Sequence, residues 1–159
     1  LDYQEIKKIN LSQIGADVPF FVHGQDSLVR GKGDIITKHT FPKYYFLIIK
    51  PNQNCSTVEM YNQVKLDGRN YDLSLDTDEI CENDYGNDFE PIAEYKYKEI
   101  SSLLKFMRCF PEVIFSRLTG SGSCIYAAFE SKKNADKSLL LFQETFPNLW
   151  SKVVENNFE

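Results

Sequence analysis

The feature that most constrains the fold is a glycine-rich turn between two short apolar runs. The turn reads Leu118-Thr119-Gly120-Ser121-Gly122-Ser123-Cys124, with Val113-Ile114-Phe115 before it and Ile125-Tyr126-Ala127-Ala128-Phe129 after it. Short apolar runs bounded by proline and charged residues favour strands, so two strands joined by a glycine turn are predicted. Glycine has no Cβ, which lets the backbone adopt left-handed angles and approach a ligand closely.

Two interpretations of this turn are open from its residues alone. Backbone N–H groups beside the hydroxyls of Thr119, Ser121 and Ser123 form a concavity suited to phosphate oxygens. The alternative is a glycine-serine hairpin that binds nothing. The turn lacks the Gly-Lys-Ser/Thr ending of a P-loop, the third glycine of a dinucleotide fingerprint and the Gly-x-Ser-x-Gly elbow of a hydrolase.

Composition limits the classes of protein to consider. The 159 residues are 42% hydrophobic, enough for a packed core and for one medium domain or one domain plus part of another. A formal charge of −5 disfavours a general nucleic-acid binder, which needs a basic face. The scattered cysteines lack metal-ligand spacing and are typical of reduced thiols in a cytoplasm: Cys55, Cys81, Cys109 and Cys124. No apolar run approaches the roughly 20 residues that span a bilayer.

A single acidic residue, Asp17, lies inside the apolar string Ile14-Gly15-Ala16-Asp17-Val18-Pro19-Phe20-Phe21-Val22. A carboxylate in apolar surroundings is costly unless a partner stabilises it. One interpretation is a carboxylate placed to remove a proton from a substrate. The other is an aspartate that caps a turn before Pro19.

The remaining pattern predicts an α+β fold, with helices on one face of an antiparallel sheet. A hairpin is expected over residues 27–38 around Gly31-Lys32-Gly33-Asp34, with a domain boundary dividing residues 1–40 from 41–159. Expected strands cover 44–49, which should be buried on both faces, and 150–154 at an edge. Expected helices cover 2–9, 56–65 behind a Ser56–Glu59 capping box, a long segment through Ala93, Tyr97, Ile100, Leu104 and Met107, and a last one through Ala135, Leu139, Phe142 and Phe146.

Acidic residues crowd the segment between Leu66 and Glu90. A metal site is conceivable there, but acids spread in this way are usually a solvated loop. Solvated loop is therefore the preferred interpretation.

Three motifs together resemble the 4-diphosphocytidyl-2-C-methyl-D-erythritol kinases, a family within the GHMP kinase superfamily. They are the Ile14–Val22 string, Gly31-Lys32-Gly33-Asp34 and the Leu118–Cys124 turn, in that order along the chain. The turn by itself indicates only the superfamily, and the combination points to this member. An Asn-Asp-x-Glu string at Asn87, Asp88 and Glu90 also matches and is interpreted as structural.

The resemblance implies an ATP- and Mg²⁺-dependent kinase of the non-mevalonate isoprenoid pathway, in a bacterial cytoplasm or a plastid stroma. It implies Asp17 as the catalytic carboxylate that accepts the proton of the substrate's 2-hydroxyl. It implies Gly120, Ser121 and Gly122 as the phosphate-binding residues, Thr57 as a residue near the catalytic centre and Tyr61 as the aromatic that stacks on cytosine.

The family's main ATP-binding loop and the lysine that partners the catalytic carboxylate lie upstream of the Gly-Ala-Asp string and do not occur in this sequence. The chain is therefore expected to be the C-terminal portion of the enzyme, inactive alone, whose partner is the N-terminal part of the same polypeptide. Alternatives are another GHMP kinase of the homoserine or mevalonate-pathway type and a non-catalytic ferredoxin-like binding module. An RNA-binding sheet is disfavoured by the acidic balance.

Overall fold

The computed structural model describes residues 11–64 and 86–156. The chain divides into two compact units, one ending at Pro42 and the other running from Lys43 to Asn157. The helix predicted over residues 2–9 and most of the acidic segment lie outside the described residues. In the part of the chain that is described, no helix has the length and apolarity to cross a membrane.

The first unit contains a short helical segment followed by a hairpin. Its elements are the 3-10 helix η1 (Leu11–Gln13), α2 (Val18–His23), β1 (Ser27–Arg30) and β2 (Ile35–Lys38). The predicted hairpin is confirmed: β1 and β2 pair antiparallel, with Arg30 opposite Ile35. Gly31 and Gly33 have φ angles of 67° and 86°, so the turn between the strands uses the left-handed region that glycine adopts without strain.

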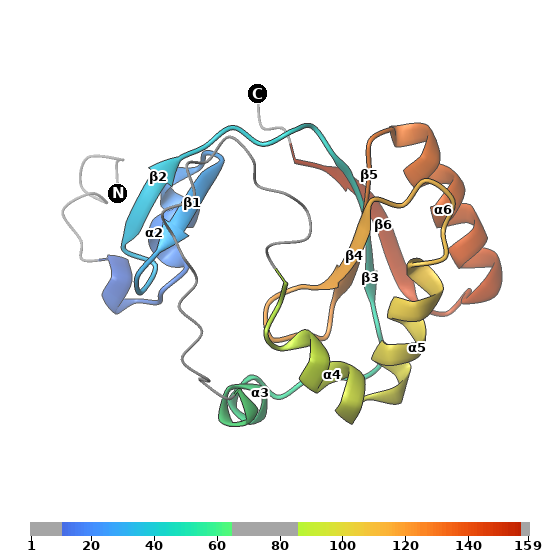
Figure 1. The fold of residues 1–159 in the computed structure, drawn as a ribbon, viewed down its shortest axis with the longest axis horizontal. Helices are drawn as coiled ribbons and strands as arrows, with labels where there is room; N and C mark the ends of the chain where they lie inside the picture. The colour runs from blue at the N-terminus through green and yellow to red at the C-terminus, as the bar shows by residue number, and fades with distance from the viewer. Residues whose placement is uncertain (1–10, 65–85, 157–159) are drawn as a thin grey trace. The chain divides into compact units, whose positions relative to one another are not determined.

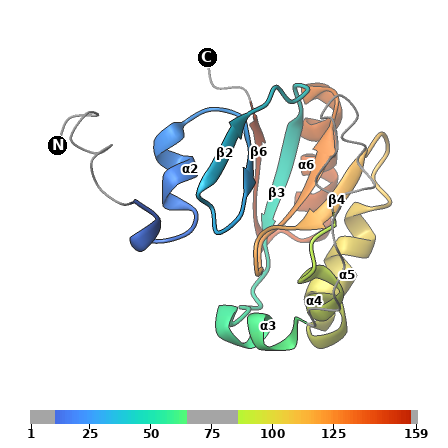
Figure 2. The ribbon, with the colours of Figure 1, turned by 60° about the vertical axis from the view of Figure 1, so that its left-hand side comes forward.

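The second unit is a four-stranded antiparallel sheet in the order β4-β5-β3-β6. Helices α5 and α6 contact one face of this sheet, as Figures 1 and 2 show. The prediction of an α+β unit with helices on one face is therefore confirmed. Its elements are β3 (Tyr45–Lys50), α3 (Thr57–Gln63), α4 (Glu90–Lys96), α5 (Lys98–Met107), β4 (Phe115–Leu118), β5 (Ile125–Phe129), α6 (Lys132–Thr145) and β6 (Trp150–Glu155).

The core lies between the sheet and these helices. In the central strand β3, Leu47 and Ile49 are fully buried, whereas Phe46 and Ile48 on the alternate face are only half-buried. The prediction that this strand is buried on both faces is wrong, because α5 and α6 pack on one face only. The opposite face carries a cluster of edge-to-face aromatic rings, formed by Tyr44, Phe46, Phe115 and Tyr126.

The single long helix predicted through Ala93 and Met107 is two helices. Tyr97 has φ −120° and ψ 100°, an extended conformation that ends α4 and begins α5. Its N–H donates to the Ala93 carbonyl and its carbonyl accepts from Ser101, so both helix ends are satisfied at one residue. Because the ring also packs against the core, tertiary contacts outweigh the continuous helical periodicity.

Candidate functional site

The glycine turn joins β4 to β5 and is closed by backbone hydrogen bonds. The Thr119 N–H donates to the Cys124 carbonyl at 2.9 Å, and the Gly122 N–H donates to the Thr119 carbonyl at 3.0 Å. Gly120 and Gly122 have φ angles of 53° and 92°, as the predicted glycine turn requires. The strand before the turn lies two residues later than predicted, because its ladder with β5 runs from Phe115 to Leu118.

The two glycines of the turn meet different surroundings. A Cβ at Gly122 would lie 2.8 Å from the Cys55 sulfur, whereas a Cβ at Gly120 would meet no atom within 4 Å. Gly122 therefore gives the close approach of the turn to the segment before α3, and Gly120 gives an open backbone edge. Burial raises the pKa of the Cys55 thiol above its ordinary value, against the opposite effect of Lys50 and Lys96.

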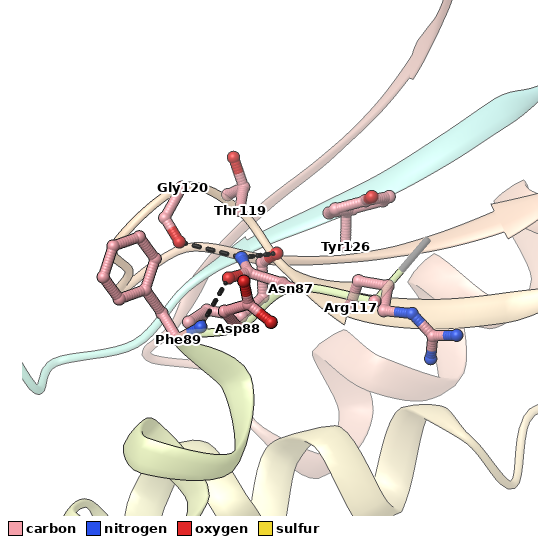
Figure 3. Close-up of a pocket in the computed structure, with 9 residues that line it drawn as sticks. Asn87, Asp88, Phe89, Arg117, Thr119, Gly120 and Tyr126 are labelled. Atoms are coloured by element: carbon pink, nitrogen blue, oxygen red, sulfur yellow. Dashed lines mark hydrogen bonds between the residues drawn. The ribbon is translucent and has the colours of Figure 1, made fainter. Parts of the chain in front are cut away.

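Asn87 binds the glycine turn through its side-chain amide. Its Nδ2 donates to the carbonyls of Leu118 and Gly120, each at 2.8 Å, and its Oδ1 accepts from the Phe89 N–H at 2.9 Å (Figure 3). The sequence predicts a structural role for the Asn-Asp-x-Glu string, and the structure shows that Asn87 holds two carbonyls of the glycine turn. Two signals in the sequence mark this residue: the match of its string to the resembled family, and its position just before a predicted helix.

Glu90 anchors the end of β4 from the same segment. Its Oε2 accepts from the Leu118 N–H at 2.6 Å, and its Oε1 pairs with Arg108 at 2.8 Å. The carboxylate is buried, with 8% of the residue exposed, and Arg108 also pairs with Glu94. The inclusion of Glu90 in a solvated acidic loop is therefore wrong, because a cation and a backbone donor stabilise it in the interior.

Helix α3 brings Thr57 to the glycine turn. The Thr57 and Ser121 hydroxyl oxygens lie 3.0 Å apart. Ser56 caps the helix by accepting from the Glu59 N–H at 3.4 Å, as the capping box predicts, but the Glu59 carboxylate pairs with Lys96. The helix ends at Gln63 rather than at about residue 65.

Tyr61 presents its ring on the same helix. It is 64% exposed, and its ring centroid lies 4.9 Å from that of Phe89 at an interplanar angle of 71°. This edge-to-face contact fixes one edge of Tyr61 against the segment that holds Asn87, and it leaves much of the ring in solvent.

Lys50, at the end of the central strand, adds a cation beside the turn that sequence reasoning missed. Its Nζ donates to the Ser123 hydroxyl at 2.6 Å, to Asn54 Oδ1 at 3.1 Å and to the Pro51 carbonyl at 3.3 Å. All three acceptors are neutral oxygens. The charge of Lys50 therefore contributes a positive potential at the base of the turn.

A pocket of about 430 Å³ opens between the glycine turn and the segment before α4 (Figure 3). Arg117 supplies a cation to this pocket, and burial raises the pKa of the Tyr126 hydroxyl while Arg117 opposes the shift. The lining residues are Gly86, Asn87, Asp88, Phe89, Arg117, Leu118, Thr119, Gly120 and Tyr126.

Asp17 belongs to the first unit, whereas the other five predicted site residues belong to the second. It occupies the position before α2, with Pro19 in the first turn, but its side chain makes no capping hydrogen bond. The residue is exposed, contrary to the expected apolar surroundings. A Cβ at Gly33 would overlap the Ala16 carbonyl, so the hairpin packs directly on the backbone next to Asp17.

Comparison with known proteins identifies a family match. Residues 71–148 match the family described as "GHMP kinases C terminal". The chain is 33% identical over 154 residues to 4-diphosphocytidyl-2-C-methyl-D-erythritol kinase of Cupriavidus metallidurans, covering 94% of this chain and 50% of that protein. It is 34% identical over 137 residues to the protein of the same name from Haemophilus ducreyi, covering 86% of this chain and 46% of the relative. The chain thus spans about half the length of these relatives.

Solved structures show the same fold. A crystal structure of 4-(cytidine 5'-diphospho)-2C-methyl-D-erythritol kinase superposes with a TM-score of 0.72 at 22% identity, over 92% of this chain and 56% of the other. Homoserine kinase from Cytophaga hutchinsonii superposes with a TM-score of 0.52 at 19% identity, over 88% of this chain and 50% of the other.

Proposed function

Because residues 71–148 match the family described as "GHMP kinases C terminal", we propose that this chain is part of an ATP-dependent small-molecule kinase. The proposed reaction transfers the γ-phosphoryl group of ATP to the 2-hydroxyl of 4-diphosphocytidyl-2-C-methyl-D-erythritol. The observation that carries the proposal is the 3.0 Å contact between Thr57 and Ser121. It joins the predicted substrate-binding helix to the predicted phosphate-binding turn, as transfer between two ligands requires.

The turn Gly120-Ser121-Gly122 is proposed to bind phosphate oxygens. Within the described residues, the N–H groups of Gly120 and Ser121 donate to no acceptor, whereas the Gly122 N–H closes the turn. Two adjacent N–H groups and the Ser121 hydroxyl form an anion-binding edge. Gly122 is proposed to shape the turn, because the absence of a Cβ lets the turn lie close to Cys55. The positive charge of Lys50, which contacts Ser123, favours an anion at the turn.

Thr57 and Tyr61 are proposed to bind the phosphate acceptor. The exposed ring of Tyr61 offers a surface on which a cytosine base can stack, a contact typically worth about 1–3 kcal/mol for single-stranded bases. Thr57 lies on the same helix as Tyr61, and its hydroxyl, 3.0 Å from that of Ser121, is proposed to contact the group that receives phosphate.

Asp17 is proposed as the general base that accepts the proton of the 2-hydroxyl, an effect that typically contributes about 10²–10⁴ in rate. Mg²⁺ is proposed to accompany ATP and to neutralise charge on its phosphates. Among the described residues no group of three His, Cys, Asp or Glu side chains could hold a metal ion. Mg²⁺ in kinases usually keeps several waters and binds through substrate phosphates with one or two carboxylates.

The test is ADP release by the full-length protein supplied with ATP and the diphosphocytidyl substrate. Asp17→Asn should lower kcat by about 10²–10⁴ with little change in the free energy of unfolding. Asp26→Asn, in the same unit, is the matched control. Unchanged kcat in Asp17→Asn would remove Asp17 from the mechanism, and turnover with homoserine or mevalonate instead would assign a different GHMP substrate. No turnover with any of the three would favour a binding module.

A further inference from the structure

We propose that Asn87 is a positioning residue that holds the glycine turn in its phosphate-binding conformation. This inference rests on the proposed function of the turn and adds a residue to which only a structural role was assigned. Asn87 does not itself contact phosphate in this proposal. It acts by engaging two backbone carbonyls of the turn, which leaves the neighbouring N–H groups available to an anion.

The first three carbonyls of the turn, from Leu118 to Gly120, are occupied by internal donors. Leu118 and Gly120 each accept from Asn87 Nδ2 at 2.8 Å, and Thr119 between them accepts from the Gly122 N–H at 3.0 Å. Three successive carbonyl oxygens are thus held within the protein. Within the described residues, the N–H groups of Gly120 and Ser121 have no corresponding acceptor.

This arrangement, with carbonyls bonded internally and two N–H groups unbonded among the described residues, favours the binding of an anion. A peptide carbonyl carries partial negative charge and repels phosphate oxygens, whereas a peptide N–H attracts them. Gly120 has no Cβ to restrict its backbone, and open space surrounds it, so its peptide can rotate unless another group holds its carbonyl. The Asn87 amide supplies that hold and so fixes the direction of the Gly120–Ser121 peptide.

Asn87 is itself held in place by its own segment. Its Oδ1 accepts from the Phe89 N–H at 2.9 Å, and its backbone carbonyl accepts from the Glu90 N–H at 2.8 Å. Glu90 then binds the Leu118 N–H from the other side at 2.6 Å. Residues 87–90 therefore hydrogen-bond both the carbonyl and the N–H of Leu118, the last residue of β4.

The residue type follows from this geometry. Only an amide offers two N–H donors for the two carbonyls and an oxygen for the Phe89 N–H. A carboxylate of the same size keeps the oxygen acceptor but turns a negative charge toward the carbonyls. Asn87→Asp therefore removes both donors to the turn while it keeps the acceptor for the Phe89 N–H, so it separates the two roles of this side chain.

The experiment compares wild type, Asn87→Asp, Asn87→Ser and the control Asn148→Asp in the full-length protein. Asn87→Ser also keeps an oxygen for the Phe89 N–H but is too short to reach the turn. Asn148 is exposed, so its substitution makes the same charge change away from the turn. The readouts are KM for ATP, KM for the phosphate acceptor, the unfolding midpoint and the ¹⁵N-glycine amide signal of Gly120 on addition of tripolyphosphate.

We expect both Asn87 variants to raise KM for ATP about tenfold, the loss of roughly one favourable hydrogen bond. KM for the acceptor should change less than twofold, and the Gly120 amide signal should no longer respond to tripolyphosphate. A parallel rise in both KM values together with a lower unfolding midpoint in both variants would overturn the inference, because it indicates a structural role only. An unchanged Gly120 response in the variants would also overturn it.

A separate result would contradict the proposed phosphate binding by the turn. If tripolyphosphate leaves the Gly120 amide signal of the wild-type protein unmoved, the turn does not bind phosphate and the inference falls with it. If the wild-type signal moves and the variants behave like Asn148→Asp, the turn binds phosphate without help from Asn87. The response of the wild-type Gly120 amide signal to tripolyphosphate therefore distinguishes failure of the proposed phosphate binding from failure of the role proposed for Asn87.

Discussion

The hydroxyl oxygens of Thr57 and Ser121 lie 3.0 Å apart, although 64 positions separate these residues in the chain. One hydroxyl comes from the first residue of α3 and the other from the middle of the glycine turn. Both residues keep solvent contact, so the hydrogen bond itself adds little stability. Its importance is that it places two short polar side chains of different elements at a single point.

We predict that Thr57 and Ser121 act as a coupled pair in substrate binding. Thr57→Val and Ser121→Ala should each lower kcat/KM for the phosphate acceptor. The double variant should lower it by less than the two single changes combined, because each single change already breaks the shared contact. A double-mutant cycle on kcat/KM measures the coupling, with Thr40→Val as a control for hydroxyl loss. If the effects of the two single variants on kcat/KM simply add, the contact between the two hydroxyls does not contribute to function.

Substitution of the two turn glycines should have unequal effects on stability. Gly122→Ala places a methyl group 2.8 Å from the Cys55 sulfur at a positive φ, so we expect a loss of about 2 kcal/mol or more in the free energy of unfolding. Gly120→Ala meets only the backbone penalty of about 1 kcal/mol, because its surroundings are open. Urea unfolding measures both values.

A second substitution separates the two causes at Gly122. Cys55→Ala removes the sulfur, so the double variant Cys55→Ala/Gly122→Ala should recover the steric part of the loss and keep the backbone part. If Gly122→Ala is no worse than Gly120→Ala, the close approach of the turn to Cys55 does not limit the residue at this position.

The exposed ring of Tyr61 should carry binding of a nucleobase. Tyr61→Ala should raise KM for the diphosphocytidyl substrate about 5- to 150-fold, equivalent to about 1–3 kcal/mol of lost stacking. Tyr61→Phe keeps the ring and should change KM little. Phe89→Leu should give an intermediate effect, since it removes the aromatic edge against which Tyr61 rests. Tyr95→Ala, at a ring that is 92% exposed, is the control. Equal KM values for all four would exclude stacking at Tyr61.

Glu90 should stabilise the fold through both of its oxygens. Glu90→Gln retains the size of the side chain but weakens the bond to the Leu118 N–H and removes the ion pair with Arg108. We expect a loss of about 1–3 kcal/mol in the free energy of unfolding, as for a buried hydrogen bond to a charged group. Glu144→Gln, at an exposed position of α6, should change stability by less than about 0.5 kcal/mol. A similar value at both positions would contradict the anchoring role.

The Cys55 thiol should respond to pH in a manner set by its burial. Burial raises its pKa above the ordinary 9.0, so the neutral thiol is favoured in the folded state. Its contribution to stability is therefore present below pH 9 and is lost as pH rises through the folded-state pKa. Iodoacetamide, which attacks the thiolate, should modify Cys55 more slowly than the exposed Cys109 at pH 8, with a rate that climbs above pH 9. Faster labelling of Cys55, located by peptide mapping, would contradict this.

Local pattern was sufficient for most of the elements. The hairpin, the order of the strands in the second unit, the Ser56 cap and the edge strand at residues 150–155 were all confirmed. Each depends on alternation, helical spacing or turn residues within a few positions, which the sequence displays directly. The motifs of the glycine turn and the Gly-Ala-Asp string also sufficed to indicate the family.

Contacts between distant positions decided the rest. The break at Tyr97, the half-buried face of β3 and the burial of Glu90 each depend on which surface another element covers. Asn87 reaches Gly120 across 33 positions, and Lys50 reaches Ser123 across 73. A side chain's partner at such a separation is set by the packing of the sheet against its helices, whereas propensity and periodicity describe only near neighbours. The sequence by itself therefore determined the glycine turn between two strands, and the tertiary structure alone determined which side chains hold that turn in place.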